Sequence, residues 1–204
     1  VQLPRGLCAI TGPAAPPGAL HLRCSVLPRC RPGSRVRTDG RTVSGVDWAL
    51  PVAAPPWSGT LPPAERLTGA ITPAALVAWA ARLGGRGAGL TPAGDDVLAG
   101  LLLVARAAGG SGVEPALVAT AESVRTTTVA AAFLSWAARG QCIAPAHDAL
   151  HTLAEHGADA TTPECTRLVT IGASSGHALL AGIRLGLGAN QGLLNTMMNV
   201  HLAS

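Results

Sequence analysis

The chain has 204 residues, of which 48% are hydrophobic, so it can form one ordinary domain, or one domain with a small appendage. Aromatic residues make up only 2%, which predicts a core of Ala, Leu and Val and favours packed helices over an aromatic-rich β-sandwich. The most apolar run stops at Arg106, short of the roughly 18–20 residues of a membrane span. The first residues lack a signal-peptide pattern, although the start at Val1 leaves trimming open. We expect a cytoplasmic protein.

The net charge of +4 is unevenly distributed. Residues 1–50 hold seven Arg against Asp39 and Asp47, whereas residues 51–204 hold eight Arg against nine acids. A basic arm can indicate a nucleic-acid partner, but these Arg residues lack interleaved aromatics, so we do not expect nucleic acid. The five Cys form no paired spacing and are expected to be reduced thiols.

Short strands are predicted in the first fifty residues, with a hairpin at Asp39-Gly40 because Gly tolerates the positive φ of tight turns. Five prolines in residues 51–63 predict an extended connection. The expected organisation is therefore a β-rich module (1–50), a Pro-rich linker (51–69) and a mainly helical domain (70–204). The predicted strands are 6–10, 20–27, 34–38 and 41–46.

Helical signals dominate after the linker. Thr72-Pro73 is a typical helix start, and Gly84-Gly85 a typical end. The β-branched run Thr126–Thr128 predicts a break in the long helical stretch that begins near Pro115. The predicted helices are 73–83, 92–108, 115–139 with that break, 145–156, 179–187 and a short one in the last dozen residues. The predicted fold class is α+β: a small N-terminal β module followed by a mainly α-helical domain.

The segment 85–96, Gly-Arg-Gly-Ala-Gly-Leu-Thr-Pro-Ala-Gly-Asp-Asp, predicts a flexible loop that leads into a helix. Glycines allow backbone amides to approach a ligand, and a helix N-terminus favours an anion. The segment lacks the Gly-Lys-Ser/Thr of a P-loop. The predicted anion-binding residues here are Gly87, Gly89, Thr91 and Gly94.

Asp95 and Asp96 are the candidate catalytic residues. Two adjacent carboxylates cannot both cap one helix, so one can cap or hold Arg while the other faces a ligand. The pair would also suit a divalent cation or an amide ligand; we expect no metal ion and no cofactor. The alternative is an ordinary helix–loop–helix connection, in which Thr91 or one Asp is a cap.

Two further segments are candidate ligand sites. One of them contains Arg125, Thr126 and Thr127, whose guanidinium and hydroxyl groups can bind phosphate or carboxylate. The alternative is that Arg125 is a solvated residue on a helix face. The other contains Ser174, Ser175 and Gly176, which lie at the start of a predicted helix. The alternative is that a serine here is an ordinary N-cap.

An internal helical repeat is suggested by the alignment of residues 94–100 with residues 176–182. If the two units pair about a pseudo-twofold axis, Gly100 and Gly182 would permit close helix contact. Both glycine-bearing loops would then face one cavity, with two helix N-termini directed at it.

His147 and His151 share one helix face, with Cys142 upstream. This spacing suits part of a zinc site, but two ligands do not make a site. We expect a partly exposed surface pair.

The segment 85–100 resembles the signature of a bacterial family that includes the third subunit of oxamate carbamoyltransferase, from anaerobic allantoin degradation. Further agreement runs from Arg125-Thr126-Thr127 to His147, and from Gly172 through Ser174-Ser175-Gly176 to Gly182. The resemblance covers about residues 70–190. Ala173 stands where the family usually has His, and Ala178 where it has Asp.

The resemblance implies carbamoyl transfer between oxalurate and phosphate, giving oxamate and carbamoyl phosphate. It also implies a complex with an acyl-CoA-synthetase-like subunit and another companion. Asp95 or Asp96 would orient the carbamoyl nitrogen while loop amides hold phosphate. Because Ala173 and Ala178 remove polar groups, a non-catalytic binding or scaffolding subunit is the alternative, and a basic-arm nucleic-acid binder is a third.

Overall fold

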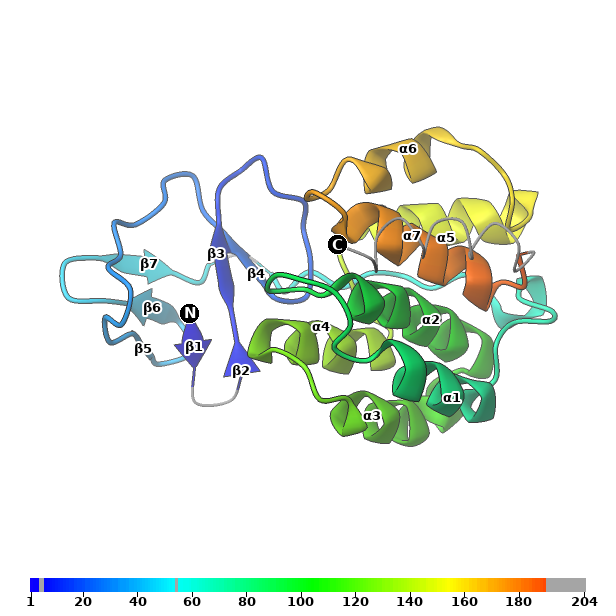
Figure 1. Cartoon of the computed structure of the whole chain (residues 1–204). Helices are drawn as coiled ribbons and strands as arrows, with labels where there is room; N and C mark the ends of the chain where they lie inside the picture. The colour runs from blue at the N-terminus through cyan, green and yellow to red at the C-terminus, as the bar shows by residue number, and fades with distance from the viewer. Residues whose placement is uncertain (4–5, 54, 190–204) are drawn as a thin grey trace. The chain divides into compact units, whose positions relative to one another are not determined.

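A computed structural model describes residues 1–3, 6–53 and 55–189, and the chain divides into two units, Val1–Ser58 and Gly59–Ser204 (Figure 1). The first unit contains short strands and the second contains the helices. The fold is therefore α+β, as the composition and periodicity predict.

The β unit contains three small sheets. β1 pairs with β2 antiparallel, β3 pairs with β4 in parallel, and β5-β6-β7 form an antiparallel sheet. The strands are β1 Gln2–Leu3, β2 Gly6–Leu7, β3 Ala9–Thr11, β4 His21–Arg23, β5 Arg37–Thr38, β6 Thr42–Ser44 and β7 Ala49–Pro51.

The predicted hairpin at Asp39-Gly40 is confirmed as the β5–β6 turn. Gly40 has φ +85°, and Asp39 Oδ1 accepts from the N–H groups of Arg41 (2.8 Å) and Thr42 (2.7 Å). The sequence prediction misses β1 and β7, and it joins β2 and β3 into one strand over residues 6–10. In β7, Pro51 lies opposite Thr42 at the sheet edge. An edge position tolerates a residue without an N–H.

The helical unit follows the predicted order, with one addition. Thr127 caps α4 by accepting from Ala130 N–H at 3.1 Å, so the predicted break at Thr126–Thr128 is confirmed. The sequence prediction misses α6, a helix of only seven residues that Thr162 caps. The predicted terminal helix lies outside the described residues. The elements are η1 Ala64–Arg66, α1 Pro73–Leu83, α2 Ala93–Gly109, η2 Ser111–Val113, α3 Glu114–Ser123, α4 Thr128–Ala138, α5 Ala144–His156, α6 Pro163–Val169 and α7 Ser175–Gly186.

Helix α2 lies at the centre of this unit, where α1, α4 and α7 pack against it (Figure 1). Its side chains Leu101, Leu103 and Val104 are fully buried. Within the described ranges, no helix is both long and apolar enough to cross a lipid bilayer.

Helices α2 and α7 cross at two glycines. A β-carbon on Gly182 would lie 2.1 Å from the Val97 carbonyl oxygen, and one on Gly100 would lie 2.5 Å from that of Leu179. The contact is reciprocal, because Val97 and Leu179 are each three residues before the crossing glycine. Such reciprocity is typical of a twofold-related contact, as the repeat hypothesis predicts for Gly100 and Gly182.

The loops before α2 and α7 are also built alike. The Gly94 N–H donates to the Arg86 carbonyl, and the Gly176 N–H donates to the Ile171 carbonyl, both at 2.9 Å. A β-carbon on Gly94 would lie 2.2 Å from Leu83 O, and one on Gly176 would lie 2.0 Å from Leu168 O. Helices α1 and α6 precede these loops, so the predicted repeat would comprise two helical hairpins, α1–α2 and α6–α7, although α1 has 11 residues and α6 has 7.

Replacing Gly182 with Ala tests the crossing. In an ordinary helix this change gains up to about 1 kcal/mol of helix propensity. Here the new methyl group forces the helices apart, so we expect the free energy of unfolding to fall by about 1–3 kcal/mol in urea titrations. Gly112→Ala is the control, because a β-carbon there meets nothing within 4 Å. A G182A variant as stable as the wild type would contradict the close contact.

Candidate functional site

The loop between α1 and α2 is exposed, and its glycines set its conformation at the start of α2. Gly85, Gly87 and Gly89 have φ of +70°, +113° and +91°, a conformation that favours Gly. Leu90 is 71% exposed. A β-carbon on Gly87 would lie 2.8 Å from Ala93 N, so Gly87 keeps the loop close to the first turn of α2.

Asp95 is buried and has hydrogen-bond partners on both carboxyl oxygens. Oδ1 accepts from the Gly85 N–H at 2.8 Å, and Oδ2 accepts from the Thr126 hydroxyl. The residue is 2% exposed. Asp95 therefore ties the start of the α1–α2 loop and the α3–α4 connection to α2, and this geometry fits a positioning role.

Asp96 has a different environment. Its Oδ2 is buried, and no described residue gives that oxygen a hydrogen-bond partner. Burial raises the pKa of Asp96 to about 7; the Ser175 hydroxyl bond opposes this shift, and the negative charge of Asp95 adds to it. A carboxyl that exchanges its proton near neutral pH is suited to proton transfer.

A chain of hydroxyl groups joins the two repeat loops at Asp96. Thr91 Oγ1 lies 3.0 Å from Ser175 Oγ, and Ser175 in turn interacts with the Asp96 carboxyl. Figure 1 shows α2 and α7 starting at the same end of the helical unit. The structure thus brings Thr91, Asp96 and Ser175 together from both halves of the repeat.

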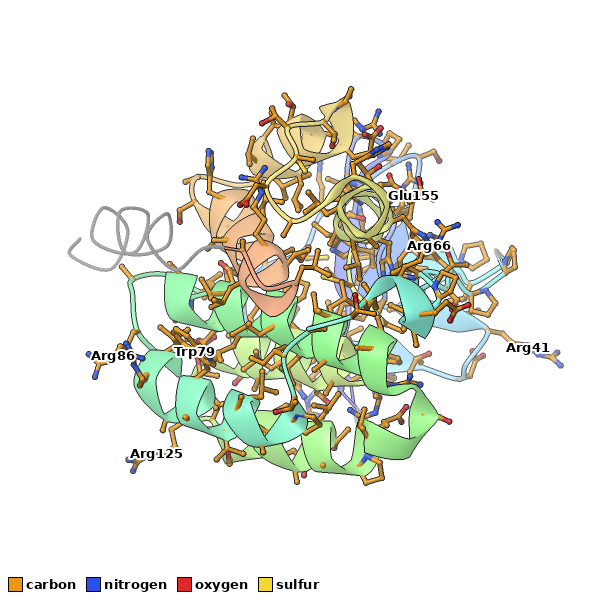
Figure 2. The ribbon with its side chains drawn as sticks, turned by 90° about the vertical axis from the view of Figure 1, so that its right-hand side faces the viewer. Arg41, Arg66, Trp79, Arg86, Arg125 and Glu155 are labelled. Atoms are coloured by element: carbon orange, nitrogen blue, oxygen red, sulfur yellow. The ribbon has the colours of Figure 1, made fainter. Side chains whose placement is uncertain are left out.

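Of the predicted residues Arg125, Thr126 and Thr127, the two threonines hold the loops in place by hydrogen bonds, and the arginine is exposed. Thr127 donates to the Leu90 carbonyl, and Thr126 is bonded to Asp95. In Figure 2 the side chains of Arg125 and Arg86 project outward from the helices. The structure does not bring the Arg125 guanidinium to Asp96.

The remaining predicted residues shape the loops. The Gly94 and Gly176 amides are bonded to carbonyl oxygens within their own loops, so these glycines serve loop closure. Ser174 lies at the N-cap position of α7, where its side chain makes no capping hydrogen bond to the described backbone. Gly89 borders open space, because a β-carbon there would meet nothing within 4 Å.

The prediction of a partly exposed surface pair is wrong for His147, which is 3% exposed. Its Nε2 accepts from the Cys142 N–H at 3.1 Å, so Nδ1 carries the proton and donates to the Thr60 carbonyl at 2.8 Å. Burial is the main cause of its lowered pKa. Gly59 lies directly over the ring, which sequence spacing alone could not indicate. No group of three metal-ligating side chains occurs among the described residues.

Cys142 is close enough to Asp96 for their charges to interact. Burial raises the pKa of the Cys142 thiol to about 12, and the Asp96 carboxylate adds to the shift. The thiol stays protonated at neutral pH and is therefore a poor nucleophile.

A family model described as oxamate carbamoyltransferase subunit AllH matches residues 83–187. The match covers 105 of the 204 residues and includes α2, α7 and both repeat loops. The chain belongs to the AllH family. The resemblance drawn from the segment 85–100 is thereby confirmed. No curated protein and no solved structure matches this AllH chain.

The raised pKa of Asp96 makes stability depend on pH. Between about pH 4 and 7 the folded chain keeps a proton on Asp96 that the unfolded chain has released, so this contribution to stability falls as pH rises and levels off above about 7. Asp96→Asn removes the titration. We expect the stability of D96N relative to wild type to increase from about pH 5 to about pH 8 in urea unfolding.

Asp159→Asn is the matched control, because Asp159 is exposed in the turn after α5. Its stability difference from wild type should stay nearly constant over the same pH range. A flat difference for D96N as well would show that Asp96 titrates normally.

Proposed function

We propose that this AllH chain is a subunit of a carbamoyltransferase complex and that its two repeat loops bind a small carbamoyl- or phosphate-bearing anion. The observation that carries the proposal is the Asp96 carboxyl, whose buried Oδ2 has no partner among the described residues. It lies where two helix N-termini and two hydroxyl groups meet. Helix starts favour anions, and hydroxyls donate hydrogen bonds to their oxygens.

In this proposal Asp96 is the proton-handling group and Asp95 is the positioning residue. Protonated Asp96 donates a hydrogen bond to the ligand, whereas the ionised form accepts from a carbamoyl NH₂ group. Thr91 and Ser175 complete the polar side of the site, and the exposed amides around Gly87 and Gly89 face the phosphate oxygens. Each Asp95 oxygen already accepts a hydrogen bond, from Gly85 or Thr126, and the residue is buried, so Asp95 positions the loops rather than meeting the ligand.

The reaction that we propose is phosphorolysis of oxalurate, and the family name supports carbamoyl transfer that involves oxamate. A phosphate oxygen forms a bond to the carbamoyl carbon, and the bond from that carbon to the oxamate nitrogen breaks. Asp96 gives its proton to the leaving nitrogen, and the proton lost by phosphate returns to Asp96. Positioning and charge stabilisation supply the rest of the catalysis, so no covalent nucleophile is needed.

Ligand-linked melting tests the site on the isolated chain. Carbamoyl phosphate at about 100 times its Kd stabilises the folded state by about 2.7 kcal/mol, which corresponds to roughly 5–10 °C in Tm for a chain of this size. We expect this shift for the wild type and for Asp159→Asn, and a shift reduced by more than half for Asp96→Ala. Scans with phosphate and with oxamate identify which part of the ligand is bound.

The absence of any shift with all three ligands would refute binding by the isolated chain. An equal shift in wild type and D96A would place the ligand elsewhere. Circular dichroism of D96A before the scan confirms that the variant is folded.

The second candidate function is a non-catalytic subunit that supports chemistry elsewhere in the complex. Ala178 favours it, because this residue occupies the repeat position that corresponds to Asp96 and carries no carboxyl group. Reconstitution with companion subunits separates the two functions. Unchanged turnover by a complex that contains D96N would support the scaffolding role, and a loss of turnover with intact assembly would support catalysis.

A further inference from the structure

The β unit contains two adjoining hollows that the proposed carbamoyl site does not use. Their volumes are about 520 and 490 Å³, and all of their lining residues lie within residues 1–48. Four residues line both hollows, which therefore form one groove: Cys30, Arg31, Ser34 and Trp48. Volumes of this size suit a small molecule.

Positive charge gathers at this groove. Arg29 and Arg31 line it from the long loop between β4 and β5, and both are exposed. None of the ion pairs among the described residues involves either guanidinium. Asp47 is the acid on the rim. The groove thus presents two guanidinium groups beside a hydroxyl, Ser34, a set that matches phosphate oxygens.

Trp48 is the aromatic residue that lines the groove, and its indole packs against the protein. A β-carbon on Gly45 would lie 2.3 Å from Trp48 Nε1, so the indole packs directly on the Gly45 backbone. The same ring lines both hollows. Trp48 thus packs against the backbone and also lines both hollows, and an aromatic side chain in a hollow is suited to stacking with a planar base.

We propose that this groove binds a nucleoside phosphate. Arg29 and Arg31 hold the phosphates, Trp48 stacks on the base, and Asp47 accepts hydrogen bonds from ribose hydroxyls. The groove offers one aromatic ring rather than the series of rings that a single-stranded nucleic acid uses, so the ligand is a mononucleotide. This site accounts for part of the Arg surplus in residues 1–50, and it does not depend on the function proposed for the helical unit.

Titration calorimetry of the full chain with ATP tests the proposal. The double variant Arg29→Ala/Arg31→Ala removes two charge-assisted contacts and should weaken ATP binding about tenfold or more. Arg37→Ala/Arg41→Ala is the charge-matched control: neither residue lines the groove, and Arg41 reaches into solvent at the β5–β6 turn (Figure 2). At about 0.15 M salt, distant charges are screened, so the control should change binding less than about threefold.

Cys30 provides a local readout, because its exposed thiol lines both hollows. Saturating ATP should slow alkylation of Cys30 severalfold, measured by mass spectrometry, and leave the rates at the partly buried Cys8 and Cys24 unchanged. Tripolyphosphate and adenosine, tested alone, should each bind at least about tenfold more weakly than ATP, because each engages only half of the groove.

Three results would overturn the proposal. Equal weakening in both double variants would show diffuse attraction of a polyanion. Tripolyphosphate binding as tightly as ATP would remove the base-stacking role of Trp48. ATP binding without protection of Cys30 would place the nucleotide elsewhere on the chain.

Discussion

The close crossing of α2 and α7 is the constraint on which the helical unit depends. Two helices can approach until backbone meets backbone only where side chains are absent, and Gly100 and Gly182 provide that condition. Because the crossing lies within two turns of both helix starts, it also fixes the distance between the loops that precede them. The contact between Thr91 and Ser175 follows from this geometry. The candidate site is therefore a by-product of core packing, and any residue that separates the helices also separates the two halves of the site.

The two adjacent aspartates show how one residue step along a helix changes the role of a carboxyl group. Successive helical positions point about 100° apart, so Asp95 turns toward the Gly85 N–H and the Thr126 hydroxyl while Asp96 turns toward the second repeat. Donors hold the first carboxyl in place. The second is desolvated without enough donors, which favours its neutral form. Asp95 is the more deeply buried of the two, so the donors within reach, rather than the degree of burial, set their different roles.

Much of this architecture can be predicted from sequence, and the limits have physical causes. The helix start at Thr72-Pro73 and the break before Thr128 follow from capping and β-branching, which are local effects. Helix α6 escapes prediction because seven residues give too little periodicity, and β7 because Pro51 normally argues against a strand. Nothing near His147 in the sequence indicates that Gly59 covers its ring, so its spacing wrongly predicts a surface position. The groove beside Trp48 escapes prediction for the same reason, because its walls come from segments separated by many residues.

The pairing of helical hairpins has an evolutionary consequence. A reciprocal contact is what two identical hairpins would form as a homodimer, in which every substitution appears twice. Joining both copies in one polypeptide removes that restriction, so each copy can change alone. In this chain the two hairpins differ at one such position, with a carboxyl group at residue 96 and a methyl group at residue 178. A single chain can therefore carry a carboxyl group in one hairpin alone, whereas a symmetric homodimer carries it in both hairpins or in neither.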